Sequence, residues 1–213
     1  MSKITKIEAQ KRTKDRVNIY IDESYAFSVS AELVYREGLR KDLEINEEKL
    51  KEVVKEDNII KCKNTALRIV ERSYKTEKEI IEKLFEKGYE KDEIDKTLEF
   101  LREYKFINDE AYTKMYVKDR SKTQGRGKIK YALMKKGVDQ EDIESALETI
   151  DKDEEKEAAL ELARKRYLVI SKRESDKYKV WNKLCRFLVG RGYDYSLEMC
   201  IRDRLLLKQL KYQ

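Results

Sequence analysis

The stretch Leu84-Phe85-Glu86-Lys87-Gly88-Tyr89 recurs twice further along the chain, as Leu133-Met134-Lys135-Lys136-Gly137-Val138 and as Leu188-Val189-Gly190-Arg191-Gly192-Tyr193. In each copy a leucine precedes a glycine by four positions, and in the first two copies apolar residues follow that glycine by six and ten positions. A glycine at this place is typical of a helix end, and the spaced apolar residues predict another helix after it. The pattern therefore predicts one unit, used three times, of two helices, a glycine turn and a third helix. Such units bury their apolar faces against their neighbours, so we expect an elongated array.

Two features of this pattern leave alternatives open. One Leu-x-x-x-Gly would mark only a common way of ending a helix, whereas three copies favour a true repeat. The third copy departs from the pattern, because Glu198 and Arg202 stand six and ten positions after Gly192. Either the last repeat is a capping variant, as terminal repeats often are, or its original end was replaced by unrelated sequence. We therefore assign no function to residues 198–213.

The N-terminal part has a different period. Val17, Ile19 and Ile21 alternate with polar residues, which predicts a half-buried strand, and Asp22-Glu23-Ser24 is a suitable hairpin turn. A returning strand should follow the turn, and residues 4–9 are expected to add a third strand. After Ser30 the period becomes helical. We expect a short helix capped by Ser30, a helix capped by Asn46, and then a separate longer helix carrying the apolar residues from 59 to 70. The predicted fold is mainly α, with a small N-terminal β-hairpin or sheet.

Composition excludes several classes of protein. The 213 residues include no proline and no histidine, and 43% are charged, against about 25% in an ordinary globular domain. The lack of proline favours long helices, and the lack of histidine excludes histidine-based triads, metal sites and pH switches. The three cysteines are far apart and fit reduced thiols. No apolar run is long enough to span a membrane and the first residues have no apolar signal core, so we expect a cytoplasmic protein.

Charge is segregated along the chain. Residues 114–136 hold nine bases and one acid, a net of +8; residues 137–162 hold eleven acids and two bases, a net of −9; residues 163–191 hold ten bases and two acids, a net of +8. For any single helix the simpler interpretation is a solvated surface with internal ion pairs. Two basic blocks on either side of an acidic one favour an interaction surface for phosphates or for an acidic protein.

The segment 120–128 is the strongest local candidate for binding. Its two glycines permit close approach of the backbone, and a helix starting near Gly127 offers free N–H groups to an anion. The alternative is a flexible basic loop between helices; the spacing does not match a Walker A loop. The main candidate contact residues are Arg120, Lys122, Arg126, Lys128, Lys130, Lys135 and Lys136, with Arg164, Arg186 and Arg191 as secondary candidates. Trp181 also lies among basic residues, but its helical spacing from Leu184 and Leu188 favours a core position.

The repeats resemble those of a known family. Thr76-Glu77-Lys78-Glu79-Ile80, with the following Lys87-Gly88-Tyr89 and Ile107-Asn108-Asp109-Glu110-Ala111-Tyr112, is similar to the first helical repeat of the RecX regulatory proteins. The run from Tyr116 to Val138 resembles the second repeat, and the run from Phe187 to Asp194 resembles the third. The resemblance covers about residues 60–197, and the N-terminal hairpin is an addition found in part of the family.

This resemblance implies a curved array of three-helix repeats that binds the recombinase RecA and its filament on single-stranded DNA. Such proteins modulate, and usually inhibit, strand exchange, ATP hydrolysis and co-protease activity; they are not enzymes, so no catalytic residues, metal or cofactor are expected. We expect a monomer. The sequence leaves open whether it also contacts single-stranded or double-stranded DNA directly, or reaches DNA only through RecA. The expected domains are an N-terminal hairpin with helices (1–57) and three repeats (58–107, 108–151 and 152–213). Reversal of Arg126 and Lys128 to glutamate should weaken inhibition without unfolding the protein.

Two other functions remain open from the sequence. The first is a general nucleic-acid-binding helical protein, which would bind DNA alone with a steep dependence on salt. The second, less favoured, is a metal-dependent nuclease. It would need converging carboxylates, whereas the acids of this chain lie in dense charged runs and at helix starts, where the helix dipole favours them.

Overall fold

The computed structural model describes residues 2–10 and 16–195, apart from the side chain of Glu47. The chain divides into two compact units, one formed by Met1–Ser73 with Ile80–Phe106, the other by Tyr74–Glu79 with the chain from Ile107 onward. The expected domain boundaries, which are drawn along the sequence rather than by contact, stay predictions.

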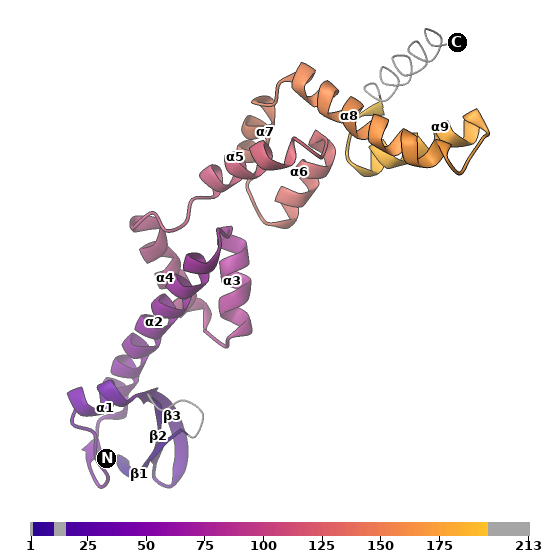
Figure 1. The fold of residues 1–213 in the computed structure, drawn as a ribbon. Helices are drawn as coiled ribbons and strands as arrows, with labels where there is room; N and C mark the ends of the chain where they lie inside the picture. Colours follow the sequence, from indigo (N-terminus) through magenta and orange to yellow (C-terminus); the bar gives the residue numbers. More distant parts are fainter. Residues whose placement is uncertain (1, 11–15, 196–213) are drawn as a thin grey trace. The chain divides into compact units, whose positions relative to one another are not determined.

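The described part of the chain is mainly helical, with a small sheet at its start (Figure 1). The strands are β1 (Ser2–Ala9), β2 (Arg16–Ile21), β3 (Ser24–Ser30) and β4 (Glu44–Ile45). The helices are α1 (Ala31–Arg36), α2 (Glu47–Arg72), α3 (Glu77–Glu86), α4 (Lys91–Glu103), α5 (Asp109–Arg120), α6 (Arg126–Lys135), α7 (Gln140–Glu148), α8 (Lys152–Ser171) and α9 (Lys177–Gly190).

The N-terminal sheet is antiparallel, in the order β3-β2-β1-β4. Asp22 and Glu23 form the two-residue turn between β2 and β3, with left-handed φ angles of 46° and 67°. Two positive φ angles are typical of the type I′ hairpin turn, so the predicted turn is confirmed without the usual glycine. The strand expected over residues 4–9 is confirmed as β1. Strand β4 was not predicted, because two residues are too few to show a period.

One long helix replaces the two that the sequence predicted after Asn46. Asn46 does cap this helix, its Oδ1 accepting from the N–H groups of Glu48 and Lys49 at 2.9 and 3.2 Å. The helix then continues as α2 to Arg72, so the expected break was wrong. Residues 55–58 contain neither glycine nor proline to end it. The first half of α2 packs on the sheet through Leu50 and Val54.

The three repeat glycines close their helices in the same way. Gly88, Gly137 and Gly192 have φ angles of 83°, 78° and 85°. In each case the N–H of the residue after the glycine donates to the carbonyl of the leucine four residues before the glycine, at 3.2 to 3.3 Å. This is the Schellman arrangement, in which only glycine adopts the left-handed position without strain. The repeated Leu-x-x-x-Gly pattern is therefore a repeated helix end.

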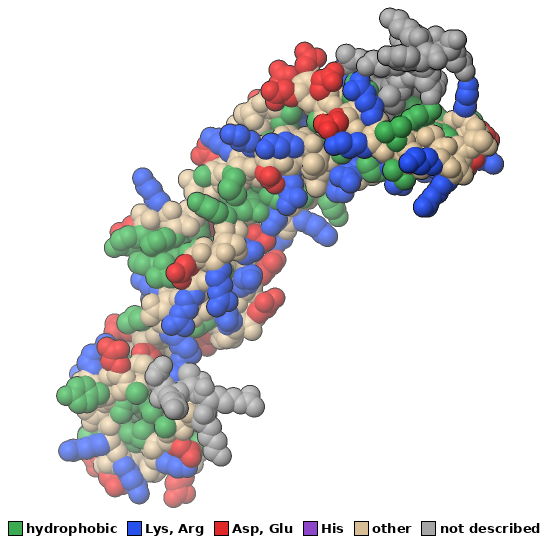
Figure 2. Space-filling view, viewed as in Figure 1, with side chains coloured by type: hydrophobic (Ala, Val, Ile, Leu, Met, Phe, Trp, Pro, Cys, Tyr) green, Lys and Arg blue, Asp and Glu red, His purple; other side chains and the backbone are tan. Residues whose placement is uncertain are grey.

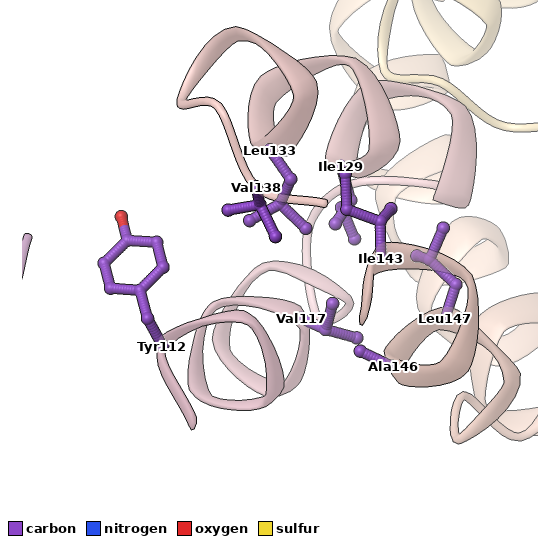
Figure 3. Close-up of a cluster of buried hydrophobic side chains, with 8 residues drawn as sticks. All are labelled: Tyr112, Val117, Ile129, Leu133, Val138, Ile143, Ala146 and Leu147. Carbon is purple, nitrogen blue, oxygen red and sulfur yellow. The ribbon is translucent and has the colours of Figure 1, made fainter. Parts of the chain in front are cut away.

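The second repeat shows how the unit forms its core. Helices α5, α6 and α7 enclose one apolar cluster, and Figure 3 shows its side chains gathered between the helices, with Tyr112 at one side. Its members are Tyr112, Val117, Ile129, Leu133, Val138, Ile143, Ala146 and Leu147. Ile143 and Leu147, the residues six and ten positions after Gly137, are both buried. The spacing that predicted the repeat is therefore the spacing of its core.

The third repeat has the same first two helices. Helices α8 and α9 pack through Ala159, Leu160, Ala163, Leu184, Leu188 and Tyr193. Trp181 is partly buried against this cluster, which confirms its predicted place in the core. The atypical tail, with Glu198 and Arg202, lies outside the described residues. The predicted fold class of tandem three-helix repeats behind a small N-terminal sheet is confirmed.

Candidate partner-binding surface

Neighbouring repeats meet where the second helix of one begins at the glycine turn of the next. In the second unit, the Thr76 hydroxyl at the start of α3 donates to the carbonyl of Lys136 at 2.7 Å. At the equivalent place 49 residues later, the N–H of Gly125 donates to the carbonyl of Arg191 at 2.9 Å. Thr76 and Gly125 each precede a helix start, and Lys136 and Arg191 each precede a repeat glycine. Equivalent places are thus joined twice, once by a side-chain hydroxyl and once by a backbone N–H.

The glycines of segment 120–128 serve this junction. The N–H of Gly127 donates to the carbonyl of Gly192 at 3.1 Å. A Cβ atom at Gly125 would overlap the carbonyl of Gly192, and one at Gly192 would overlap the backbone of Lys128. Close backbone approach was predicted correctly, but its partner is the next repeat and not a phosphate. The N–H of Arg126 also has an acceptor, Glu155 Oε1 at 3.3 Å, so the predicted anion site at this helix start is wrong.

Arg126 has an internal role. Its Nε lies 2.8 Å from Glu155 Oε2, and its Nη2 donates to the carbonyl of Ile150 at 2.7 Å. The Glu155 side chain is only 14% exposed. A glutamate at position 126 would leave two carboxylates facing each other in a poorly solvated place, which destabilises the fold. We therefore now expect reversal of Arg126 to destabilise the fold, and the contact surface proposed below leaves Arg126 out.

Several other candidates also have partners within the protein. Lys136 Nζ lies 2.7 Å from Glu79 Oε1, and both side chains are mostly buried. Arg191 donates to the carbonyl of Thr123 at 3.2 Å, and Lys128 to that of Gly190 at 3.3 Å. These three cations help to hold the junctions together.

Lys130 and Lys135 are engaged more loosely. Lys130 Nζ lies 3.1 Å from Glu144 Oε1 in a pair whose side chains are both about half exposed, and such pairs contribute little to stability. Lys135 Nζ lies 5.8 Å from the centre of the Tyr131 ring. Both lysines stay available to a partner.

The remaining four candidates are exposed. Lys122, Arg164 and Arg186 have no ion pair with any residue that the structure describes. Arg120 is 3.5 Å from Asp119 and 5.5 Å from the Tyr116 ring, with its side chain still 46% exposed. Figure 2 shows lysine and arginine side chains mixed with acids on the face in view. The candidates are therefore spread over α5 to α9 rather than gathered at one point.

Two concavities lie among these helices. One, of about 950 Å³, adjoins the junction of the second and third repeats, and Lys128, Lys152, Tyr131 and Val189 are among its lining residues. The other, of about 450 Å³, is lined in part by Lys114, Lys118 and Lys122. Lys152 was not among the predicted candidates, because it stands in the acidic block, but in the folded chain it lines the same concavity as Lys128.

Three groups near the junctions have shifted pKa values. Burial alone would lower the pKa of Lys136, but its hydrogen bonds with Glu79 and Tyr112 outweigh burial and raise it. Burial of Glu79 opposes ionisation, yet the hydrogen bond from Lys136 lowers the pKa of that carboxyl overall. Burial raises the pKa of Tyr193 to about 12, and its hydroxyl has no hydrogen-bond partner among the described residues. These shifts belong to packing at the junctions and not to a reactive centre.

The described residues hold neither a metal-binding cluster nor a membrane-spanning helix. No group of three or more cysteine, aspartate or glutamate side chains is arranged to hold a metal ion there. None of the helices in residues 2–10 and 16–195 combines the length and apolar character needed to cross a membrane.

The fold and this surface define a class: helical-repeat proteins made of three-helix domains behind a small N-terminal sheet, with exposed cations along the repeats. Four family models match the chain in order, the RecX N-terminal domain at residues 2–46 and the first, second and third RecX three-helix domains at 62–101, 108–147 and 153–197. The chain belongs to the RecX family of regulatory proteins.

Similar proteins support this assignment. The Regulatory protein RecX of Clostridium perfringens (strain 13 / Type A) is 54% identical over 205 residues, which cover 96% of this chain and 97% of that protein. The Regulatory protein RecX of Clostridioides difficile (strain 630) is 38% identical over 97% of both chains. A crystal structure of regulatory protein RecX aligns with a TM-score of 0.68 and 30% identity, over 95% of this chain and 100% of that one. Another, of RecX from Lactobacillus salivarius, aligns with a TM-score of 0.63.

Proposed function

We propose that this chain binds the recombinase RecA and its filament on single-stranded DNA, and that it inhibits strand exchange, ATP hydrolysis and co-protease activity. The observation that carries the proposal is the match of all four RecX domains, in order, along one chain. The protein acts by stoichiometric binding as a monomer, without a cofactor and without a catalytic step.

The charges of the second unit support this proposal. Lys122, Arg164 and Arg186 are exposed and without ion pairs to other described residues, and Lys130 and Lys135 are engaged only loosely. Exposed cations of this kind accelerate association with a negatively charged partner and fix its register more than they raise affinity. We therefore propose the exposed cations of α5 to α9 as the contact surface, reduced from the ten expected residues to those that are free to bind.

Binding to a preformed filament tests the proposal. The protein is mixed with RecA assembled on long single-stranded DNA in the presence of a non-hydrolysable ATP analogue, and the filament is sedimented. We expect the protein in the pellet with RecA–DNA, at a ratio to RecA that saturates. The same amount pelleting with DNA alone would support the rival general nucleic-acid-binding protein, and absence from the RecA–DNA pellet would contradict the proposal.

A further inference from the structure

The first unit exposes a cluster of three aromatic rings at the end of α4. The centres of the Phe100 and Tyr104 rings are 4.8 Å apart, and the Phe106 ring lies 6.2 and 6.4 Å from them. Tyr104 is 60% exposed and Phe106 is 47% exposed. Figure 2 shows hydrophobic side chains gathered on the surface over this end of α4. Exposed apolar side chains that touch one another, unlike scattered ones, are typical of a binding site.

These rings are not needed to close the core of the unit. The buried face of α4 carries Ile94, Leu98 and Leu101, each at most 3% exposed. Tyr104 and Phe106 follow Leu101 where the chain leaves the helix, outside that buried stripe. The exposed faces of these two rings are therefore available to a partner.

Cations accompany the rings. Lys63 Nζ, on α2, lies 4.7 Å from the centre of the Phe100 ring. Lys105 stands between Tyr104 and Phe106 with a left-handed φ of 57°. The acids Glu99 and Glu103 lie on the same helix, so the local charge is mixed and the rings dominate the surface.

The conformation of Lys105 is unusual within this chain. The N–H of Lys105 donates to the carbonyl of Arg102 at 3.0 Å, and that of Phe106 to Leu101 at 2.8 Å, which is the Schellman arrangement again. Among the described residues, four other helix ends close in this way, and all have glycine at the left-handed position. These glycines are Gly38, Gly88, Gly137 and Gly192. Strained residues gather at functional sites, so a lysine kept here despite its strain indicates a use for its charge beside the rings.

We propose that Phe100, Tyr104 and Phe106 form a stacking platform for the bases of single-stranded nucleic acid, with Lys63 and Lys105 contacting its phosphates. Every base has a π face, so exposed rings bind bases without regard to sequence, and nearby cations neutralise the backbone. The cation over the Phe100 ring and the lysine between the two exposed rings favour an anionic ligand with flat apolar faces, as nucleic acid has, over an apolar peptide. The platform lies within the first unit and does not depend on the proposed binding of RecA.

The test measures direct binding to DNA without RecA. The fluorescence anisotropy of labelled oligothymidylate is recorded with the wild-type chain and with the double variant Tyr104→Ala/Phe106→Ala. We expect the variant to bind roughly tenfold more weakly, or worse, because each stacked base is lost. An abasic oligonucleotide has the same phosphates and no bases. The wild type should bind it weakly, and the double variant should bind it about as weakly as the wild type does.

Two control variants separate stacking from other effects. Tyr104→Phe keeps the ring and should retain binding, and Tyr35→Ala removes a tyrosine that is 91% exposed on α1, outside the cluster, and should also retain it. Circular dichroism confirms that the variants fold. Unchanged binding of oligothymidylate by the double variant would overturn the proposal, as would equal binding of the abasic strand. A double variant that keeps DNA binding but no longer inhibits RecA would show that the rings contact a protein instead.

Discussion

At the scale of single residues, positions with left-handed backbone angles determine how several helices of this chain end. Gly88, Gly137 and Gly192 end helices at positive φ, where a side chain would strain the backbone. Gly192 has a second constraint, since a Cβ atom there would overlap Lys128. Lys105 occupies the same kind of position without being glycine. The stability of the fold therefore depends on residues that the hydrophobic pattern does not reveal.

Replacing Lys105 by glycine should stabilise the protein. Glycine adopts a φ of 57° without the clash between Cβ and carbonyl that lysine bears, so we expect the free energy of unfolding to rise by about 1 kcal/mol. Urea denaturation followed by circular dichroism measures the change. Gly88→Ala, at the matching helix end, should do the opposite by a similar amount. A loss of stability in Lys105→Gly would contradict the assigned backbone conformation.

The Glu79–Lys136 ion pair should make stability depend on pH. The pKa of Glu79 is lowered in the folded state, so its contribution is present above its ordinary value of 4.5 and is lost as the pH falls through the lower folded value. The pKa of Lys136 is raised, so its contribution is present below its ordinary value of 10.5 and is lost only as the pH rises beyond it. Between these limits the pair contributes on the order of 1 kcal/mol.

The variant Lys136→Met measures this contribution. It removes the cation but keeps the alkyl chain, so the pKa of Glu79 should return towards or above its ordinary value. The difference in unfolding free energy between wild type and variant should be constant near neutral pH and shrink in acid below about pH 4.5. If the difference is the same at neutral pH and in acid, packing of the Lys136 side chain, and not its charge, stabilises the junction.

At the scale of helices and strands, the sequence predicted the helix ends and the hairpin turn, which depend on residues close together along the chain. Asn46 and Gly88 begin and end helices as expected, and the turn at Asp22 and Glu23 was predicted from its position between alternating strands. The break expected within α2 was wrong, because a charged run without glycine or proline continues a helix. The sequence did not reveal contacts between residues that are far apart along the chain. The glycines of segment 120–128 looked like a phosphate site because their partner, the turn at Gly192, lies more than sixty residues away.

The junction of the second and third repeats can be broken at one glycine. Gly125→Ala places a methyl group against the carbonyl of Gly192. That carbonyl is backbone, and the methyl group is fixed to the backbone Cα of residue 125, so neither can move aside cheaply. We expect a loss of about 2 kcal/mol in the free energy of unfolding, as for other overpacked sites. Gly190→Ala is the matched control, since a Cβ atom there meets nothing within 4 Å. Equal stabilities of the two variants would contradict the junction as described.

At the scale of the whole molecule, the order of domains along the chain carries the functional assignment. The tandem repeats and the N-terminal sheet were predictable from the sequence, since a period of about fifty residues and a change from strand to helix period are visible without a structure. The contact surface was less predictable. The basic blocks suggested ten residues, but Arg126 and Lys136 are held in ion pairs within the protein, and a sequence does not show which cations are already paired.

Reversing exposed cations should separate binding from folding. The triple variant Lys122→Glu/Arg164→Glu/Arg186→Glu should retain the wild-type circular dichroism spectrum and melting temperature, because these side chains have no ion pairs with other described residues. We expect about ten times more of it to be needed for half-maximal inhibition of RecA-promoted strand exchange.

A control with the same change in net charge isolates the surface. This control is the triple variant Lys41→Glu/Lys51→Glu/Lys87→Glu, which reverses three exposed lysines of the first unit. This control should inhibit like the wild type. Equal weakening by both triple variants would attribute the effect to net charge and remove α5 to α9 as the contact surface.

The most direct test of the central claim is the rate of ATP hydrolysis by RecA on single-stranded DNA as this protein is added. We predict that the rate falls with each addition and levels off once the filament is saturated. The ratio of this protein to RecA at that plateau should stay the same when the DNA is held in excess. A rate that stays constant with the protein in excess over RecA would contradict this prediction.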